Sequence, residues 1–416
     1  MTPDTSIYIH IPFCVHRCAY CDFNTYAGQQ DSIPAYVDAL IREINYLGHA
    51  TSRLADYQTI STIFFGGGTP SLLSGPQLAS VMDALRAAFA FSPNLEATLE
   101  ANPGTTSLDF LHQIRAAGLN RLSFGVQSAN ADELHMLERA HDFFDVIQSV
   151  KWARQAGFGN LNLDLIYGLP EQNLQTWQNT VKRIVDLHPE HISAYALTLE
   201  HGTPFGRWSA KGLLPTPSPD LAADMYEWAG DYLESNGYFQ YEISNWAKLK
   251  DESGKMKDEM DSSFISRSDP SSFACRHNLQ YWRGLPYLGL GAGAHGYANG
   301  YRYSNVLRIK TYIERLALPS AFRLLPFPLT PATVNHHRQT QQDDMGEFMM
   351  TGLRLTREGI SSTEFESRFG ARLDDVYGKD VEELTRLGLL EWQAERLRLT
   401  RRGRLLGNQV FMRFVG

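Results

Sequence analysis

The chain has 416 residues, of which 43% are hydrophobic and 20% charged, a composition typical of soluble globular proteins with about two to three domains. Its formal net charge of −8 does not favour nucleic acid as a partner, and it has no apolar run long enough to span a membrane. Its four cysteines exclude a disulfide framework, and its start lacks the features of a signal peptide, so we expect a cytoplasmic protein.

Short β-rich runs alternate with helical stretches through the first half of the chain. The runs predict strands at residues 6–11, 62–65, 96–102, 121–126, 160–168 and 191–199. Apolar residues three and four apart predict helices at 34–48, 76–90, 107–118, 131–140, 145–157 and 173–187. Such alternation indicates an α/β fold with parallel strands joined by right-handed crossovers. The sheet is either open or closed into a barrel, and in both cases ligands gather at the carboxyl ends of its strands.

The rest of the chain is less regular. We expect a connecting region at 206–325, with a charged, serine-rich surface insertion at about 247–272 and a segment rich in glycine and aromatic residues after it. The tail, 326–416, is mostly helical in pattern and ends in a helix followed by a small hairpin, as in winged-helix modules. The predicted domains are therefore 1–205, 206–325 and 326–416.

Residues with reactive or polar side chains lie at the carboxyl ends of several predicted strands, which form one edge of the sheet. Three cysteines, Cys14, Cys18 and Cys21, follow the first strand, and the glycine-rich run 66–73 follows the second. Polar residues end the next three strands or lie within them: Glu100, Asn102, Gln127 and Asp164. Because carboxyl ends of parallel strands meet at one edge, we interpret these residues as one site.

The spacing C-x3-C-x2-C leaves several explanations open. Structural zinc requires four ligands, which His10 or His16 would have to complete. A redox dithiol requires only the C-x2-C pair, and ordinary buried cysteines require no ligand at all. An iron–sulfur cluster is the third chemical option, since closely spaced cysteine thiolates are its usual ligands. Three thiolates on a four-iron cube would leave one iron open to a substrate or cofactor.

The cysteine loop directly after one strand, with "GGGTP" after the next, resembles the radical S-adenosylmethionine (SAM) enzymes. The resemblance implies a partial (β/α)6 barrel and a [4Fe–4S] cluster held by Cys14, Cys18 and Cys21. In that family the open iron is chelated by the amino and carboxylate groups of SAM. Electron transfer to SAM then yields a 5′-deoxyadenosyl radical, so the cofactor supplies the chemistry.

Further motifs resemble the coproporphyrinogen dehydrogenase-like branch of that family, over about residues 6–300: "IYIHIPFC", "FFGGGTPSLL", "LEANPG", "RLSFGVQS", "LDLIYGLPEQ" and "GLGAGAHGY". The dehydrogenases of this branch carry another cysteine two residues after the third, where this chain has Phe23. The motif "HNLQYW" at 277–282 is instead characteristic of the heme chaperones of the branch.

The resemblance therefore implies a heme chaperone that binds a [4Fe–4S] cluster, SAM and heme. It would pass heme to acceptors such as respiratory cytochromes, with peripheral membrane contact and an electron donor such as a flavodoxin or ferredoxin. The alternative is an oxygen-independent coproporphyrinogen III dehydrogenase, which oxidatively decarboxylates its substrate to protoporphyrinogen IX. A radical SAM enzyme acting on another substrate is a third hypothesis.

The resemblance also assigns SAM-binding positions, which are Tyr8, Tyr20, Gly67, Gly68, Thr69, Glu100, Gln127, Arg139 and Asp164. Several of these positions have a purely structural alternative. Tyr8 is equally well explained as a strand aromatic in the core, and the glycines as a tight turn. For Asp164 the alternative is a strand-end cap or ion pair, and for Arg139 it is a solvated helix residue.

The heme-binding hypothesis falls mainly on the "HNLQYW" motif. Imidazole and thiolate are ligands of heme iron, and aromatic side chains stack on porphyrins. The candidate residues are Cys275, His277, Asn278, Tyr281, Trp282 and, near the cysteine loop, His10. A histidine beside a tryptophan is more often a hydrogen-bonded packing residue, and His10 is also explained as a core histidine.

Overall fold

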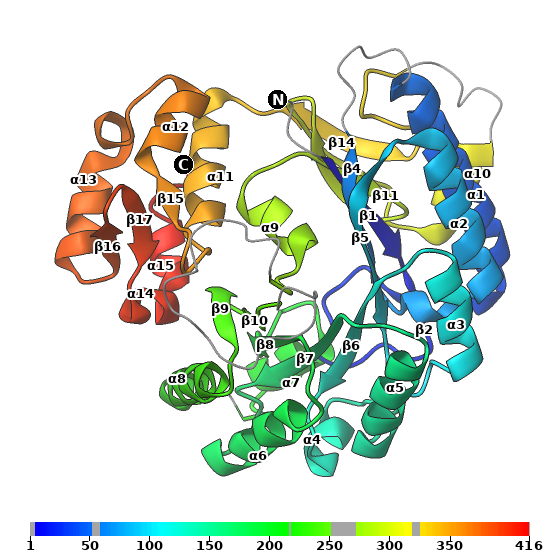
Figure 1. Cartoon of the computed structure of the whole chain (residues 1–416), viewed down its shortest axis with the longest axis horizontal. Helices are drawn as coiled ribbons and strands as arrows, with labels where there is room; N and C mark the ends of the chain where they lie inside the picture. The colour runs from blue at the N-terminus through cyan, green and yellow to red at the C-terminus, as the bar shows by residue number, and fades with distance from the viewer. Residues whose placement is uncertain (1–4, 52–58, 216–217, 251–271, 318–324, 416) are drawn as a thin grey trace. The chain divides into compact units, whose positions relative to one another are not determined.

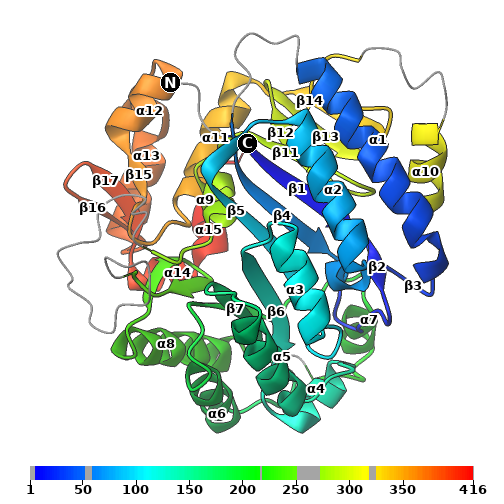
Figure 2. The same cartoon turned by 45° about the vertical axis from the view of Figure 1, so that its right-hand side comes forward.

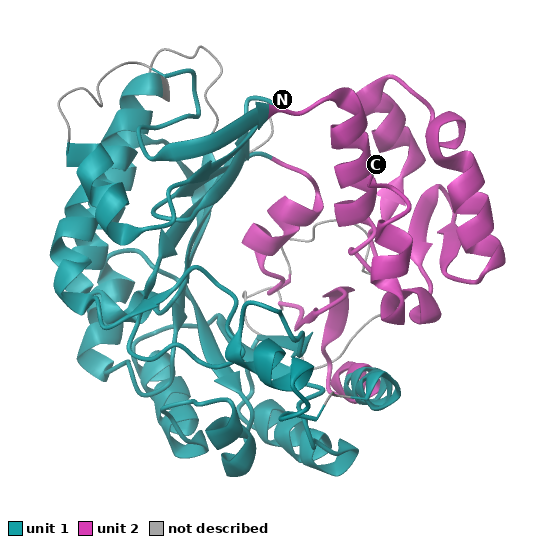
Figure 3. Cartoon of the chain, turned by 180° about the vertical axis from the view of Figure 1, so that it is seen from behind, with its two compact units in different colours: residues 1–229, 286–337 teal, residues 230–285, 338–416 magenta. Residues whose placement is uncertain are grey.

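The computed structural model describes residues 5–51, 59–215, 218–250, 272–317 and 325–415. Contacts within the chain define two compact units, each built from two segments (Figure 3). Unit 1 comprises residues 1–229 and 286–337, and unit 2 comprises residues 230–285 and 338–416. The sequence suggested three consecutive domains instead. Most of the predicted insertion at 247–272 lies outside the described residues.

Unit 1 contains the predicted parallel sheet. Its six strands lie side by side in chain order: β1 (Thr5–Ile11), β4 (Ile60–Gly67), β5 (Phe91–Ala101), β6 (Arg121–Gln127), β7 (Leu161–Tyr167) and β8 (His191–Ala196). The connecting helices are α1 (Ile33–Thr51), α2 (Gly75–Ala88), α3 (Leu108–Ala116), α4 (Ala131–Met136), α5 (Phe143–Gln155) and α6 (Leu174–Val185). Figures 1 and 2 show α1, α2, α3 and α5 along one side of the sheet. The predicted α/β class and its six strand–helix units are confirmed.

Apolar and polar side chains alternate along the strands, so that one face of the sheet packs in the core and the other, inner face is polar. In β7, Leu161, Leu163 and Leu165 are fully buried and form part of the apolar core. Successive side chains of a strand point to opposite faces, so Asn162 and Asp164 lie on the other face. The sheet therefore presents polar groups inward, toward the side away from the helices.

Unit 1 extends the sheet with strands that the sequence did not predict. β11 (Tyr287–Leu290) pairs in parallel with β1, and the order continues through β12 (His295–Ala298), β13 (Tyr301–Asn305) and β14 (Thr333–Arg338). The short elements of the unit are β2 (Phe13–Cys14), β3 (Tyr26–Ala27), η1 (Gln30–Ser32), η2 (Pro70–Leu72), α7 (Pro204–Ala210) and α10 (Ile309–Ala317). α8 (Pro219–Ser235) runs across the boundary between the units. α10 packs on α1.

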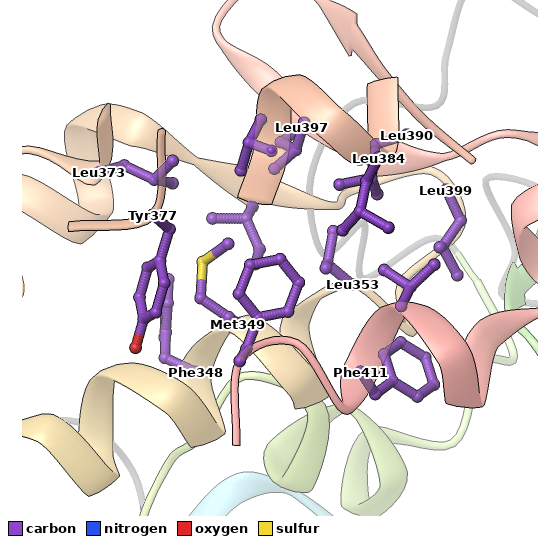
Figure 4. Close-up of a cluster of buried hydrophobic side chains, with 14 of the residues drawn as sticks. Phe348, Met349, Leu353, Leu373, Tyr377, Leu384, Leu390, Leu397, Leu399 and Phe411 are labelled. Atoms are coloured by element: carbon purple, nitrogen blue, oxygen red, sulfur yellow. The ribbon is translucent and has the colours of Figure 1, made fainter. Parts of the chain in front are cut away.

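Unit 2 has its own apolar core, drawn in Figure 4, in which Phe348, Met349, Leu353, Leu384 and Phe411 are buried. Its helices are α9 (Arg276–Trp282), α11 (Gln341–Gly352), α12 (Ser362–Phe369), α13 (Leu373–Arg386), α14 (Arg401–Leu405) and α15 (Gly407–Phe411). Its strands are β9 (Phe239–Glu242), β10 (Asn245–Ala247), β15 (Ile360–Ser361), β16 (Leu390–Gln393) and β17 (Arg396–Leu399).

The predicted hairpin of the tail is present as β16–β17, which directly follows α13 and pairs with β15 through β17. The tail does not end in this hairpin as predicted, because the short helices α14 and α15 follow it. Across the described part of the chain, no helix combines the length and apolar character required to cross a bilayer.

Candidate functional site

The three cysteines lie on one loop that leaves the carboxyl end of β1. Cys14 ends β2, which pairs in parallel with β3 in the register Cys14 to Ala27. The amide of Cys21 donates to the carbonyl of Cys18 at 3.0 Å, which closes a turn between the other two cysteines. All three thiols are free of disulfides, Cys14 being buried and the other two partly exposed. The loop thus presents three sulfurs within eight residues of a fixed backbone.

The protein groups around the loop oppose thiolate formation. Burial raises the pKa of Cys14 and of Cys21, and the neighbouring cysteine charges raise it further. A bound metal reverses this effect, because a coordinated thiol is deprotonated outright. Cationic groups are also in place: Arg139 Nη1 donates to Cys18 Sγ at 3.8 Å, and Arg17 donates to the carbonyl of Cys21 at 3.4 Å. The loop is therefore chemically suited to an anionic thiolate cluster.

The three loop cysteines match the kind of ligand that an iron–sulfur cluster uses. Among the described residues, no three His, Cys, Asp or Glu side chains are placed to hold one metal ion. Three thiolates of a four-iron cube bind three different irons, so their sulfurs do not converge on one point. The donor set of Cys14, Cys18 and Cys21 is the thiolate set that such a cluster requires.

The glycine run after β4 is fixed by close contact with the cysteine loop. Gly67 has φ +111°, and a Cβ added there would meet the His10 ring at 2.4 Å. A Cβ on Gly68 would meet the carbonyl oxygens of Phe13 and Ile11 at 2.6 and 2.9 Å. The backbone amide of Gly68 donates to the Ile11 carbonyl at 2.9 Å. Glycine is therefore required here by packing against the cysteine loop, whatever ligand the strand end also faces.

Tyr8 and His10 support the loop from β1. Tyr8 Oη is 3.0 Å from His10 Nδ1, and His10 Nε2 is 2.9 Å from the carbonyl oxygen of Asn24. Burial lowers the pKa of His10, and the charge of His295 adds to that effect against the opposing bond to Asn24. A neutral His10 with both ring nitrogens engaged fits a supporting role. Tyr20 packs in a cluster with Ala19 and Phe205.

Glu100 faces the glycine run across the sheet. Its Oε2 accepts from the amide of Gly67 at 3.0 Å, and a Cβ on Gly66 would lie 3.1 Å from the same oxygen. Burial, with a smaller contribution from the charge of Asp164, raises the pKa of Glu100 to about 8. A cationic group at this strand end, such as an amino group, would stabilise the ionised form.

Asp164 is the centre of a polar network on the inner face. Its Oδ2 accepts from Ser123 Oγ at 2.8 Å, and its Oδ1 accepts from Asn162 Nδ2 at 2.7 Å. Asn162 Oδ1 is 2.6 Å from His191 Nδ1 and accepts from Ser193 Oγ at 3.1 Å. Burial raises the pKa of Asp164 despite these bonds. The carboxyl is thus anchored by side chains from three neighbouring strands.

Arg139 joins two cysteines through a chain of hydrogen bonds. Its Nη2 donates to Asn102 Oδ1 at 2.6 Å, and Asn102 Nδ2 donates to Thr69 Oγ1 at 3.1 Å. Thr69 Oγ1 donates in turn to Cys14 Sγ at 3.7 Å, while Arg139 itself reaches Cys18. Arg139 therefore acts at the cysteine loop and is not simply a solvated helix residue.

The structure thus gathers most of the predicted site residues at one end of the unit 1 sheet. Gln127 is also there: it ends β6 with φ 68°, a left-handed backbone that is uncommon outside glycine, and its Nε2 lies near Gly125. Sequence reasoning missed Arg121, which is 1% exposed on β6 and whose charge lowers the pKa of Glu100 and Asp164. Polar residues at alternate positions of strands with an otherwise apolar pattern were the signal that could have found this inner network.

The heme candidates of "HNLQYW" lie in unit 2, on α9. His277 is 1% exposed, and its Nε2 is 2.9 Å from Tyr281 Oη. Cys275 is fully buried at the start of the helix, where its amide donates to Tyr241 Oη. The guanidinium of Arg354 lies 4.3 Å from the Trp282 ring centroid. Asn278 is partly exposed. In this conformation, the two proposed iron ligands of the motif are therefore enclosed by protein.

Comparison with known proteins places the chain in a family. Residues 8–184 match the family model of the radical SAM superfamily, and residues 339–406 match the HemN C-terminal domain. The chain is 38% identical to the heme chaperone HemW of Bacillus subtilis (strain 168), over 99% of each chain. The chain belongs to the HemW family. The HemW of Escherichia coli (strain K12) is 34% identical over 99% of this chain and 98% of its own.

A solved structure confirms the fold. Coproporphyrinogen III oxidase (HemN) of Escherichia coli superposes with a TM-score of 0.78 at 24% identity, covering 99% of this chain and 90% of that one. At that identity the likeness concerns the fold and not the reaction. For HemW proteins, membership of the radical SAM superfamily implies a [4Fe–4S] cluster and SAM.

Proposed function

We propose that this chain is a cytoplasmic heme chaperone that carries a [4Fe–4S] cluster on Cys14, Cys18 and Cys21 and also binds SAM and heme. The observation that carries the proposal is full-length similarity to curated heme chaperones HemW, with 38% identity in the example from Bacillus subtilis. The absence of a fourth loop cysteine, with Phe23 exposed at that position, favours this function over the dehydrogenase.

In this proposal the strand ends of unit 1 bind the nucleotide. Cys14, Cys18 and Cys21 would hold the cluster, which would leave one iron with an open coordination position for SAM. Glu100 lies beside the partly exposed backbone of Gly67, and its raised pKa would fall next to a cationic amino group. Arg139 and Gln127 lie at the same end of the sheet, together with Asp164, and provide donors and acceptors for the polar groups of SAM. Tyr8 and Tyr20 provide aromatic surfaces.

Heme is the cargo in this proposal. The acceptors would be heme proteins such as respiratory cytochromes, reached through peripheral membrane contact, and a flavodoxin or ferredoxin would reduce the cluster. His277, Tyr281 and Trp282 remain candidates for the heme contact. Since His277 is enclosed, its use as an iron ligand requires α9 to move.

The cluster assignment is tested by anaerobic reconstitution of Cys18→Ala. We expect loss of the broad iron–sulfur absorbance and of most bound iron and sulfide. Cys275→Ala is the matched control, since Cys275 forms no disulfide and lies outside the loop, and its cluster content should equal that of the wild type. Equal cluster content in Cys18→Ala and the wild type would refute the ligand assignment.

The function is tested by supplying reconstituted wild-type protein with hemin and, separately, with coproporphyrinogen III, SAM and reductant. We expect stoichiometric heme binding without protoporphyrinogen formation. Robust conversion of coproporphyrinogen III would establish the dehydrogenase instead. Cleavage of SAM with no affinity for heme would indicate a radical SAM enzyme with a different substrate.

A further inference from the structure

The extended part of the unit 1 sheet carries an aromatic and cationic surface that neither the motifs nor the relatives assign. Tyr287 on β11 pairs with Tyr297 on β12, and Tyr297 pairs with Arg302 on β13. Residues paired across strands point to the same face, so these three side chains form one surface. The Arg302 guanidinium lies 4.2 Å from the Tyr297 ring centroid and donates to Tyr287 Oη at 3.0 Å. We call these residues, with His295, the β11–β13 surface.

His295 completes this surface. It lies two residues before Tyr297 on β12, so both side chains point to the same face, about 7 Å apart along the strand. Its cross-strand partner on β13 is Ser304, a small residue. His295 is exposed, and Tyr297 and Arg302 are partly exposed. An imidazole, aromatic rings and a guanidinium are thus arranged side by side on a rigid sheet.

The β11–β13 surface is tied to the cysteine loop. Asn24, three residues after Cys21, donates from Nδ2 to the carbonyl of Ala292 at 3.3 Å, and Ala292 lies three residues before His295. A Cβ on Gly293 would meet Asn24 Nδ2 at 2.3 Å, so the two segments are in tight contact. Both are part of unit 1. A ligand on this surface would therefore lie beside the cysteine loop.

We infer that the β11–β13 surface binds heme, with His295 as the iron ligand and Arg302 pairing with a propionate. Heme is a flat, apolar macrocycle with a central metal and anionic carboxylates at one edge. Imidazole binds its iron, tyrosine rings stack on its face, and a stacked guanidinium binds a carboxylate. The flat macrocycle therefore matches the tyrosine rings in shape, and its carboxylates are opposite in charge to the Arg302 guanidinium. The inference rests on the proposed function, because it names the surface that the cargo would occupy.

The contrast with α9 favours this surface over the "HNLQYW" motif as the first heme contact. His277 is 1% exposed and bonded to Tyr281, and Cys275 is fully buried, so neither reaches a ligand without rearrangement. His295 is exposed without any rearrangement. Among the buried histidines, His10 has both ring nitrogens within hydrogen-bond distance of other groups.

The test is a hemin titration of the anaerobically reconstituted full chain, followed in the Soret region. We expect His295→Ala to weaken binding at least tenfold and to shift the Soret band, and Arg302→Gln to weaken binding less without shifting it. His336→Ala is the matched control. His336 is an exposed histidine on β14, and its ring lies near Tyr301. Tyr301 directly precedes Arg302 on β13 and so points to the other face of the sheet. Replacing His336 should therefore leave the titration unaltered.

The outcomes separate this inference from the function on which it rests. If wild-type protein binds no heme, the proposed function and the inference both fail. If the wild type binds heme and His295→Ala gives a superimposable titration, only the inference is overturned, most clearly when His277→Ala abolishes binding. His295→Gln serves as a second variant in case the alanine variant loses its cluster, and unchanged binding by the glutamine variant would overturn the inference equally.

Discussion

Glu43 of α1 is fully buried, and its carboxylate holds together three distant parts of unit 1. Oε1 accepts from Asn305 Nδ2 and Thr330 Oγ1, each at 2.8 Å. Oε2 accepts from the Gly291 amide at 2.8 Å and from Tyr312 Oη at 2.6 Å. All four partners donate, which only a carboxylate with two acceptor oxygens satisfies completely.

This network also fixes the cysteine loop from behind. Tyr36 Oη donates to the His10 carbonyl at 2.7 Å and accepts from the Ala292 amide at 2.8 Å. A Cβ on Gly291 would meet the His10 carbonyl oxygen at 2.4 Å. Displacing the Gly291–Ala292 turn would therefore disturb both β1, where the loop begins, and the strand that carries His295.

The substitution Glu43→Gln changes the charge but hardly the volume, so its effect follows from hydrogen bonding. The amide group must replace one oxygen. If the glutamine NH2 group takes the place of Oε2, it faces the Gly291 N–H, which is also a donor. If it takes the place of Oε1, it faces the Asn305 NH2 group, again a donor. Either orientation leaves about one buried donor unsatisfied, at about 1–3 kcal/mol, and weakens bonds that were charge-assisted. We expect a loss of about 2–4 kcal/mol, or roughly 5–10 °C in the midpoint of thermal unfolding.

The assay is thermal unfolding followed by circular dichroism, together with the rate at which reconstituted protein loses its iron–sulfur absorbance. Glu43→Gln should lower the midpoint and accelerate cluster loss. Asp38→Asn, the same change at an exposed position of the same helix, is the control and should alter neither. A Glu43→Gln variant as stable as the wild type, with an equally durable cluster, would refute the role assigned to this carboxylate.

Three further predictions concern the site. Gly67→Ala should prevent cluster assembly, because the added Cβ would overlap the His10 ring. Gly159→Ala is the control and should assemble its cluster normally, because there is open space around Gly159. Equal iron content in the two reconstituted variants would contradict this. Burial lowers the pKa of His141 to about 4, so on acidification the unfolded state binds a proton at this histidine before the folded state does. The free energy of unfolding should therefore fall by about 3 kcal/mol as the pH drops from about 6.5 to 4. Urea titrations at several pH values should show a flatter pH dependence for His141→Gln. The raised pKa of Glu100, about 8, has the opposite effect: metal-free protein should lose up to about 5 kcal/mol of stability as the pH rises from 4.5 to 8. A stability difference from Glu100→Gln that does not change with pH would count against this.

The parallel half of the fold was predictable because its strands are apolar runs bounded by turns and its helices are amphipathic. The strands β11 to β14 were not predicted. They are short, β11 to β13 are rich in glycine and tyrosine, and β11 pairs with β1, which is distant in sequence, so no local periodicity marks them. β11 joins β1 only because the segment after residue 285 returns to the sheet edge.

The site residues that stand out by their spacing in the sequence were predictable. Features that depend on packing in the folded chain were less so. Cys14, Cys18 and Cys21 stand out by spacing alone. By contrast, the burial of His277 and the anchoring of Asp164 by Asn162 depend on neighbours from other elements, which a motif does not contain. The role of the glycine run was only partly foreseen, since Gly67 is required by contact with the His10 ring on β1, and Gly68 by contact with the backbone where the cysteine loop begins.

The most direct test of a chaperone function is transfer of heme. Reconstituted protein loaded with one equivalent of heme is mixed anaerobically with a heme-depleted b-type cytochrome, and the cytochrome spectrum is followed over time. We expect the cytochrome to gain its heme while the cluster absorbance of the donor persists. Heme that stays on the loaded protein, or that reaches the cytochrome no faster than free hemin does, would contradict it.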